Sequence, residues 1–161
     1  MIADLSLESP CTGKERPLHY AEVFFEAAKR ISSSLFTDEV LKAIVESTAR
    51  AINAKGASLL LLTPDKKQLI HSATCGLSDW FIQKGPLLAE KSLSRALEGK
   101  PMQVLNAAWD KNIQYHWHMK KEGIASILAV PVVLENEVIG MMRVYTSEPR
   151  HFSEEEISFV E

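Results

Sequence analysis

A chain of 161 residues with 46% hydrophobic and 24% charged residues has the composition of one soluble globular domain with a single substantial core. Its 18 basic and 21 acidic residues nearly balance, and no basic run exceeds a lysine pair, which excludes an electrostatic footprint for nucleic acid. No stretch is apolar for long enough to span a membrane, and two cysteines make no disulfide framework, so we expect a cytoplasmic protein.

The first third of the chain predicts a leader followed by two helices. Residues 1–16 are polar, contain Pro and Gly and show no periodicity, so they are interpreted as a flexible leader to a domain over 17–161. Apolar residues then recur at spacings of three and four over 20–35 and again over 40–52. Each of these two stretches predicts an amphipathic helix.

The rest of the chain alternates hairpins with a mixed segment. Residues 57–63 and 68–75 predict two antiparallel strands, and residues 123–146 predict a second hairpin. Between the hairpins, residues 76–122, called the insertion below, predict short helices, a short strand and loops. A last helix begins near Ser153, where a Ser-x-x-Glu spacing is typical of a capping box. This order predicts the α+β class with a central antiparallel sheet.

A proline and a glycine lie in the middle of the two arms of the second hairpin. If Glu135-Asn136 form a two-residue loop, Pro131 is expected opposite Gly140 at a non-hydrogen-bonded pair. Because proline cannot donate to a neighbour on its other side, the ladder there must break, bulge or end. Gly140 leaves room for a bend or for the close approach of another backbone.

These residues resemble the closing hairpin of GAF domains, whose pattern is roughly S-x-L-x-V-P-L, a polar turn, and V-I-G-V-L-x-L. Here the corresponding segments are SILAVPV at 126–132 and VIGMMRV at 138–144. Residues 152–156, FSEEE, resemble the motif that opens the last GAF helix. Residues 35–45 resemble the early helix, and 57–62 the first strand. Five pieces in the right order, over about residues 20–161, identify the chain as similar to this family.

The resemblance implies a central antiparallel sheet with the first and last helices on one face. On the other face, the insertion would cover a cavity for a small molecule. It also implies a sensory and regulatory role, homodimerisation through terminal helices and an output domain in a longer chain. Phe24 and Ile31 repeat at seven in the first helix, which favours pairing of helices. The last helix stops after one or two turns, so we expect it to be truncated.

Candidate metal ligands are few. His116 and His118 are two residues apart and would point to nearly opposite sides of a helix, although on a strand they would share a face. His118 and Glu122 have a chelating separation, but a solvated pair is the simpler interpretation, since metal sites usually need three or four ligands. His71 and Cys75 would share one strand face about 13 Å apart, too far to share an ion. We therefore expect no metal site; haem bound to a histidine is less favoured than a half-buried strand histidine, and the cofactor is unknown.

Known GAF activities leave few traces in this sequence. The methionine sulfoxide reductases of the family use several cysteines, whereas Cys75 has only Cys11, in the leader, as a second thiol. Residues 106–122 contain no cysteine, which excludes covalent bilin attachment at the usual place. The signature of cyclic-nucleotide-binding relatives is also absent, which weakens a nucleotide ligand without removing it. We expect a protein that is not an enzyme.

Aromatic and polar side chains gather in the insertion, where all three tryptophans lie between positions 80 and 117. Pockets for organic ligands combine aromatic walls with a few polar groups, but the same rings could fill the cavity as a second core. The second hypothesis is therefore a dimerisation module with a filled pocket and no ligand. Arg143 either snorkels at the sheet edge, which we favour, or neutralises an anionic ligand. The predicted ligand-binding residues are Trp80, Phe81, Trp109, Asn112, Gln114, Tyr115, His118 and Arg143.

Overall fold

The computed structural model describes residues 37–91, 94–111 and 113–161. The predicted leader at 1–16 and the predicted first helix at 20–35 lie outside the described residues. In the part of the chain that is described, no helix has both the length and the apolar character needed to cross a bilayer.

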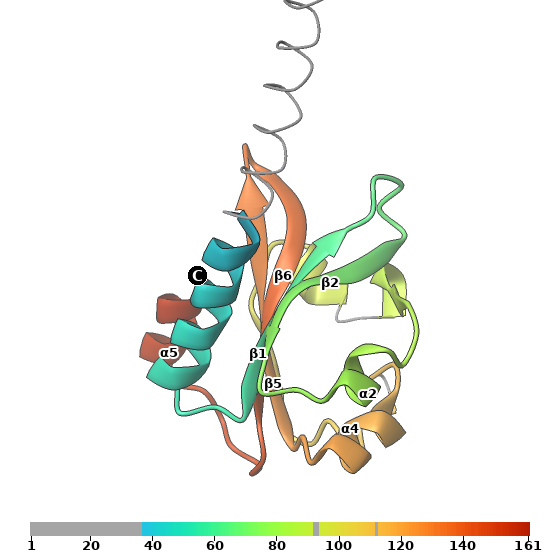
Figure 1. Ribbon diagram of the computed structural model, residues 1–161, viewed down its shortest axis with the longest axis vertical. Helices are drawn as coiled ribbons and strands as arrows, with labels where there is room; N and C mark the ends of the chain where they lie inside the picture. The colour runs from blue at the N-terminus through green and yellow to red at the C-terminus, as the bar shows by residue number, and fades with distance from the viewer. Residues whose placement is uncertain (1–36, 92–93, 112) are drawn as a thin grey trace, which may run out of the picture. The chain divides into compact units, whose positions relative to one another are not determined.

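A six-stranded sheet with the order β3-β2-β1-β6-β5-β4 forms the centre of the fold (Figure 1). All neighbouring strands are antiparallel. This confirms the predicted α+β class, because both predicted hairpins and their antiparallel pairing are present. The strands are β1 (Gly56–Leu62), β2 (Gln68–Cys75), β3 (Leu87–Leu88), β4 (Met102–Val104), β5 (Ser126–Leu134) and β6 (Glu137–Thr146).

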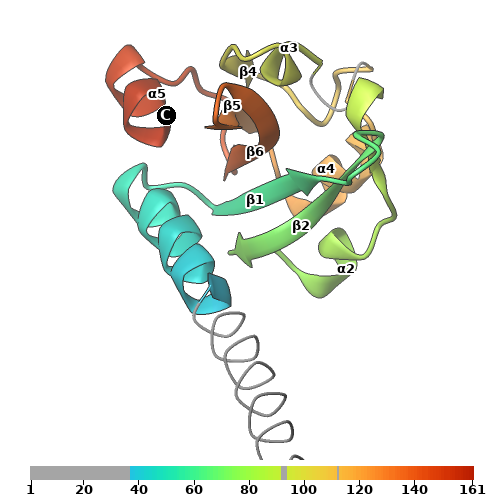
Figure 2. The ribbon, with the colours of Figure 1, turned by 90° about the horizontal axis from the view of Figure 1, so that it is seen from above.

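The helices divide between the two faces of the sheet (Figures 1 and 2). One face is covered by α5 and by a helix whose described part runs over 37–51. The helices of the insertion cover the other face. The other helices of the described residues are α2 (Asp79–Ile82), the 3₁₀ helix η1 (Ala89–Lys91), α3 (Ser94–Leu97), α4 (His116–Glu122) and α5 (Glu154–Val160).

Local signals end or begin these helices where the sequence predicted. Asn53, with φ of 51°, takes the left-handed conformation that ends the helix over 37–51. At α5, the Ser153 hydroxyl accepts a hydrogen bond from the Glu156 N–H, and the Glu156 carboxylate accepts one from the Ser153 N–H. The predicted capping box is therefore confirmed.

The sheet separates two sets of buried apolar side chains. Residues from β1, β6 and the insertion, including Leu60, Phe81 and Met141, form what we call the insertion-side core. Residues packed against the helix over 37–51 and against α5, including Val45 and Leu128, form the helix-side core. Because side chains alternate along a strand, β6 contributes to both cores.

The hairpin of β5 and β6 departs from the predicted register by one residue. Glu135 and Asn136, with φ of 50° and 65°, form the two-residue loop as expected. A β-bulge between Val132 and Val133 then moves Pro131 opposite Met141, so the predicted pairing of Pro131 with Gly140 is wrong. The bulge shifts the register because it places two residues of β6 against one of β5.

Two other expectations are confirmed: the ladder on the far side of Pro131 ends, and another backbone approaches Gly140 closely. The pairing of β4 with β5 ends at Met102 opposite Ala129, so Pro131 lies beyond that ladder and its missing N–H disrupts no bond there. Gly140 lies against β1, where a Cβ atom would collide with the carbonyl oxygen of Leu60. Only a glycine fits this close backbone approach.

A second irregularity corrects the predicted facing of His71. Leu60 pairs with His71, whereas its neighbour Leu59 pairs with Ala73, so Ser72 is an extra residue in β2. The extra residue reverses the alternation of side chains beyond it. His71 therefore faces the insertion while Cys75 packs with the helix-side core, and the expectation that both share one face is wrong.

Candidate functional site

The face of the sheet beneath the insertion contains buried polar groups within an apolar core. Arg143 on β6 is 3% exposed and pairs in register with Ser58 on β1, which is 0% exposed. The hydroxyls of Ser58 and Tyr145 lie 2.9 Å apart, so each satisfies the other. The Tyr145 ring meets the Phe81 ring edge to face, with centroids 6.0 Å apart. Strands β1 and β6 thus direct these polar groups toward the same face.

The burial of Arg143 excludes snorkelling, the interpretation favoured from the sequence. β6 is an interior strand with β1 on one side and β5 on the other, so its side chains cannot reach a sheet edge. The Arg143 Nε donates a hydrogen bond to the Met141 Sδ at 3.3 Å, and thioether sulfur is a weak acceptor. The guanidinium is therefore held inside the domain.

Lys84, in the loop after α2, brings a second basic group to this region. Its Nζ donates to the Phe81 carbonyl oxygen at 2.9 Å and lies 3.8 Å from the centroid of the Phe81 ring. Burial lowers the pKa of Lys84 to about 8, with a further lowering from Arg143 that Glu122 partly opposes.

His71 is the third basic residue. Both of its ring nitrogens are buried and have no hydrogen-bond partner among the described residues. Burial, and then the positive charges of Lys84 and Arg143, lower the pKa of His71 to about 4. Arg143 bonds to Met141, which pairs in register with Leu60, the partner of His71. Lys84 lies over Phe81, whose ring contacts Tyr145 on β6. Since these contacts place the three basic side chains on the same face of the sheet, we refer to Arg143, Lys84 and His71 together as the basic cluster. An open groove of about 330 Å³ beside β2 is lined by His71 and Ile82, among other residues.

Three of the predicted ligand-binding residues meet at the surface of the insertion: His118 contacts both Trp80 and Tyr115, whose ring centroid lies 5.2 Å from that of His118. Trp80 on α2 stacks on His118 of α4 with ring centroids 5.0 Å apart, and Trp117 packs edge-on against Trp80. Lys121 lies over the Trp80 ring at 4.1 Å. Because Trp80 is 39% exposed and Trp117 is 57% exposed, these rings cover the outside of the insertion.

Gln114 and Tyr115 connect two parts of the insertion. The Gln114 Oε1 accepts from the Leu88 N–H at 2.9 Å, and its Nε2 donates to the Pro86 carbonyl oxygen at 3.1 Å. The Tyr115 hydroxyl donates to the same oxygen at 3.1 Å. Both side chains thus fasten the segment before α4 to the segment around β3.

Trp109 lies apart from the Trp80 cluster, with which it makes no ring contact among the described residues. It is 71% exposed and carries the Lys120 Nζ 4.4 Å from its ring centroid. Asn112 lies outside the described residues. Among the predicted ligand-binding residues that the structure describes, only Phe81 and Arg143 are buried.

Sequence reasoning missed Lys84, Ser58 and Tyr145 and undervalued His71. A serine in the apolar strand Ala57–Leu62 was a usable signal, because a buried hydroxyl needs a partner. Lys84 carried no signal, since it lies in an irregular loop whose path depends on tertiary packing. The candidate metal pair was His118 and Glu122. The Glu122 carboxylate instead accepts hydrogen bonds from the Ser78 N–H at 2.8 Å and from the Ser78 Oγ at 2.6 Å.

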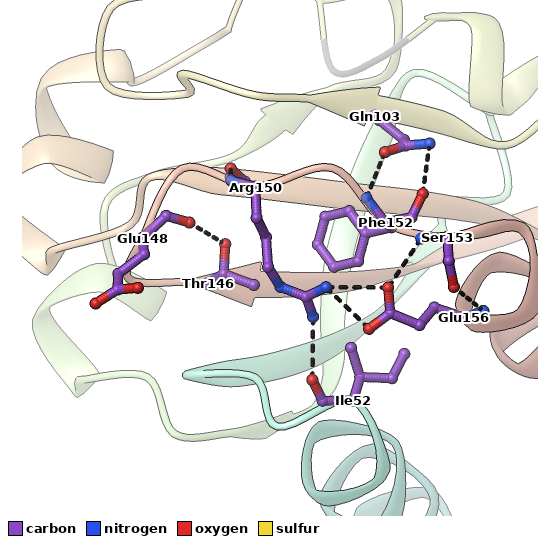
Figure 3. A network of polar contacts seen from close by, with 9 residues as sticks. Ile52, Gln103, Thr146, Glu148, Arg150, Phe152, Ser153 and Glu156 are labelled. Carbon is purple, nitrogen blue, oxygen red and sulfur yellow. Dashed lines mark hydrogen bonds and ion pairs between the residues drawn. The ribbon is translucent and has the colours of Figure 1, made fainter.

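A separate polar network joins the terminal helices to the sheet (Figure 3). The Arg150 Nη1 donates to both carboxylate oxygens of Glu156 in α5, at 2.9 and 3.0 Å. Its Nη2 donates to the Ile52 carbonyl oxygen, just after the helix over 37–51, at 3.0 Å. Gln103 on β4 exchanges two hydrogen bonds with the backbone of Phe152, at 2.8 and 3.3 Å. One arginine therefore connects the helix over 37–51 to α5, and these two helices are called the terminal helices below.

Comparisons with known proteins agree with this architecture. A family model described as GAF domain matches residues 34–161. A domain assigned to a two-component sensor histidine kinase protein from Sinorhizobium meliloti 1021 is 27% identical, with a TM-score of 0.64 over 74% of this chain and 79% of that chain. No curated protein is a significant match.

Two further solved structures are similar in fold alone. The GAF domain of a phosphoenolpyruvate-protein phosphotransferase from Coxiella burnetii is 22% identical, with a TM-score of 0.66 over 76% of this chain and 74% of that chain. A type II free methionine-R-sulfoxide reductase from Thermoplasma acidophilum is 15% identical, with a TM-score of 0.65 over 79% of this chain and 86% of that chain. Since the family model covers most of the sequence and the fold agrees with it, the chain belongs to the GAF domain family, whose members generally act as sensory and regulatory domains of signalling proteins.

Proposed function

We propose that this GAF domain is a non-catalytic sensor that binds a small molecule between the sheet and the insertion and relays binding through its terminal helices. The observation that carries the proposal is the set of polar groups buried on that face. Arg143, His71 and the Ser58–Tyr145 pair lie in or beside an apolar core, where polar groups cost free energy unless they are bonded. A few converging polar groups among apolar walls are typical of ligand sites.

Strand β6 offers a direct route from such a ligand to the helices. Arg143 and Tyr145 face the insertion, whereas Met142 and Val144 pack in the helix-side core. A ligand that favours one position of β6 therefore also favours one packing of the helix over 37–51 and of α5. The Arg150 network then holds these two helices together, so they respond as a unit.

Thermal unfolding in the presence of nucleotides, amino acids and aromatic metabolites tests the proposal. We expect one chemical class to raise the Tm, and mass spectrometry of the purified protein to identify a bound molecule. Hydrogen exchange then checks the relay: the bound molecule should alter the protection of α5 as well as that of the insertion. A uniform lack of response to the whole panel would remove the sensor function.

The absence of catalysis is part of the proposal. Cys75 packs with the helix-side core, and the chain has one other cysteine, Cys11, so a thiol relay of the sulfoxide reductase type is not supported. We expect the protein not to reduce free methionine sulfoxide in a coupled assay. A cytoplasmic location within a longer signalling chain completes the proposal, and cell fractionation checks it.

A second function, a dimerisation module without a ligand, is favoured by a different observation. Val40 and Ile44 lie one turn apart on the helix over 37–51 and are 43% and 44% exposed. Phe159 on α5 is 58% exposed. Large apolar side chains exposed on terminal helices are suited to contact with a second copy of the chain. The predicted pairing through Phe24 and Ile31 lies outside the described residues.

A further inference from the structure

The basic cluster assembles from three separate parts of the chain. Arg143 belongs to the interior strand β6, His71 to β2, and Lys84 to the loop after α2. Arg143 is more than nine-tenths buried, and the ring nitrogens of His71 are buried as well. Arg143 and Lys84 are both positively charged and repel each other, and both disfavour the charged form of His71, so their proximity has to be offset by other interactions.

The described acidic residues offset this charge only in part. None of the ion pairs formed between described residues includes a member of the basic cluster. Glu122 is the acidic residue that acts on Lys84, and its two oxygens already accept hydrogen bonds from Ser78. Buried basic groups are usually paired with carboxylates. The basic cluster therefore has an excess of positive charge.

The basic cluster also has unused hydrogen-bond donors. Among the described residues, Arg143 makes one hydrogen bond, from its Nε to the Met141 Sδ, and its two terminal nitrogens make none. A guanidinium presents its donors as a planar fork that matches two oxygens of a carboxylate or a phosphate. Lys84 supplies a compact charge over Phe81 on the same face of the sheet, and a protonated His71 would supply a further donor.

We propose that the molecule bound by this domain carries a carboxylate or phosphate group, and that Arg143, Lys84 and His71 bind this group. The inference rests on the proposed function, since it names the chemical class of the ligand at the same face of the sheet. One oxyanion would join β6 and β2 to the loop after α2. Binding would thereby draw the insertion onto the strand that also contacts the terminal helices.

Substitutions of Arg143 test the inference on the folded chain. Arg143→Met removes the charge but retains a long apolar side chain, and Arg143→Lys retains the charge but removes the fork. Lys100→Met, at an exposed position, is the control for loss of one positive charge. The probes are inorganic phosphate, succinate with its neutral partner succinamide, and benzoate with its neutral partner benzamide. Thermal unfolding is followed at constant ionic strength, so that general salt effects cancel.

We expect at least one anionic probe, at roughly ten times its Kd, to raise the Tm of the wild type and of Lys100→Met by about 4 °C. Its neutral partner should have no effect. Arg143→Met should lose the shift, and Arg143→Lys should bind the probe about tenfold more weakly. Without a probe, the Tm of Arg143→Met should equal or exceed that of the wild type, because an unmatched buried charge is removed.

Three results would overturn the inference. The first is a full anion-induced shift in Arg143→Met, which would place the anion elsewhere. The second is a large loss of Tm in both Arg143 variants with no anion response in the wild type, which would make the arginine structural. The third is stabilisation by neutral metabolites but by no anionic probe. In that case the proposed sensor function would be retained, and only the anionic class of the ligand would be rejected. A lack of response to every compound would remove both.

Discussion

Single residues of this domain take their roles from the strands around them. Two of them lie beside Leu60 on β1. His71 is the register partner of Leu60, and the backbone of Gly140 packs closely against the Leu60 carbonyl oxygen. For His71 the surroundings decide the protonation of the ring. For Gly140 they decide which side chain is tolerated. Each of these effects can be measured with one substitution.

Replacing His71 should change how stability depends on acidity. The pKa of His71 is about 4 in the folded chain, below its ordinary value of 6.5, chiefly because burial disfavours the charged ring. As the pH falls from about 6.5 to 4, the unfolded chain therefore takes up a proton that the folded chain does not. Allowing for solvent screening, the wild type should lose about 1–2 kcal/mol of unfolding free energy over this interval. His71→Gln should lack that loss.

Urea unfolding at several pH values between 7 and 4 provides the measurement. Both chains lose stability as their carboxylates are protonated, so the difference between them isolates His71. His151→Gln, at an exposed position, is the control for removal of one imidazole. Parallel acid profiles for the wild type and His71→Gln would show that burial of the ring does not govern its charge.

Gly140→Ala should be costly for a steric reason. The new Cβ would meet the carbonyl oxygen of Leu60, a backbone atom that cannot move aside without disturbing the pairing of β1 and β6. We expect a loss of about 1–3 kcal/mol in the free energy of unfolding. Gly99→Ala is the comparison, because a Cβ there meets nothing within 4 Å and only the positive φ of 83° opposes it. A smaller loss for Gly140→Ala than for Gly99→Ala would contradict the steric argument.

At the scale of elements, the helix over 37–51 and α5 share the helix-side core, and one side chain, Arg150, forms hydrogen bonds at both. Arg150 precedes α5 and reaches the end of the helix over 37–51, so it closes a contact between segments 98 residues apart in sequence (Figure 3). Burial raises the pKa of Glu156, but the hydrogen bond from the Ser153 backbone, followed by the hydrogen bonds and the charge of Arg150, outweighs it, so the pKa is lowered. The same residues cap α5 and connect it to its neighbour.

Arg150→Ala should lower the free energy of unfolding by about 1–3 kcal/mol, because it removes charge-assisted bonds to Glu156 and leaves the Ile52 carbonyl oxygen without its donor. Arg150→Lys should recover part of the loss, since one ammonium cannot reproduce both connections. Lys66→Ala is a matched control: its ion pair with Glu137 spans 3.2 Å but is exposed, so it should cost less than about 0.5 kcal/mol. Equal losses for Arg150→Ala and Lys66→Ala in urea unfolding would refute the special role of Arg150.

At the scale of the whole molecule, the exposed apolar residues of the terminal helices predict self-association. We expect light scattering to show a concentration-dependent dimer, and the double variant Val40→Glu with Ile44→Glu to shift it toward the monomer, because two buried carboxylates would be costly at the contact. Ile70→Glu is the control, since Ile70 is 57% exposed and lies on β2 rather than on a helix. A wild type that stays monomeric at the highest concentration would contradict this prediction, and dissociation by Ile70→Glu alone would move the contact to the sheet.

The class of the fold and its family were accessible from the amino-acid sequence because their signals are local. The helical spacing of apolar residues over 40–52, the Glu135-Asn136 loop and the Ser153 capping box depend on residues close in sequence, and each was confirmed. The motif around Pro131 and Gly140 likewise predicted a closing hairpin and a close backbone approach.

Only the tertiary structure decided which residues form the candidate site. One extra residue at Ser72 turns His71 toward the insertion, and one bulge displaces Pro131 from Gly140, although neither leaves a periodic trace in the sequence. Arg143 is buried because β6 is flanked by β1 and β5, and Lys84 is held against Phe81 by an irregular loop. Which charges converge depends on contacts between segments far apart in the chain, and local patterns do not encode such contacts.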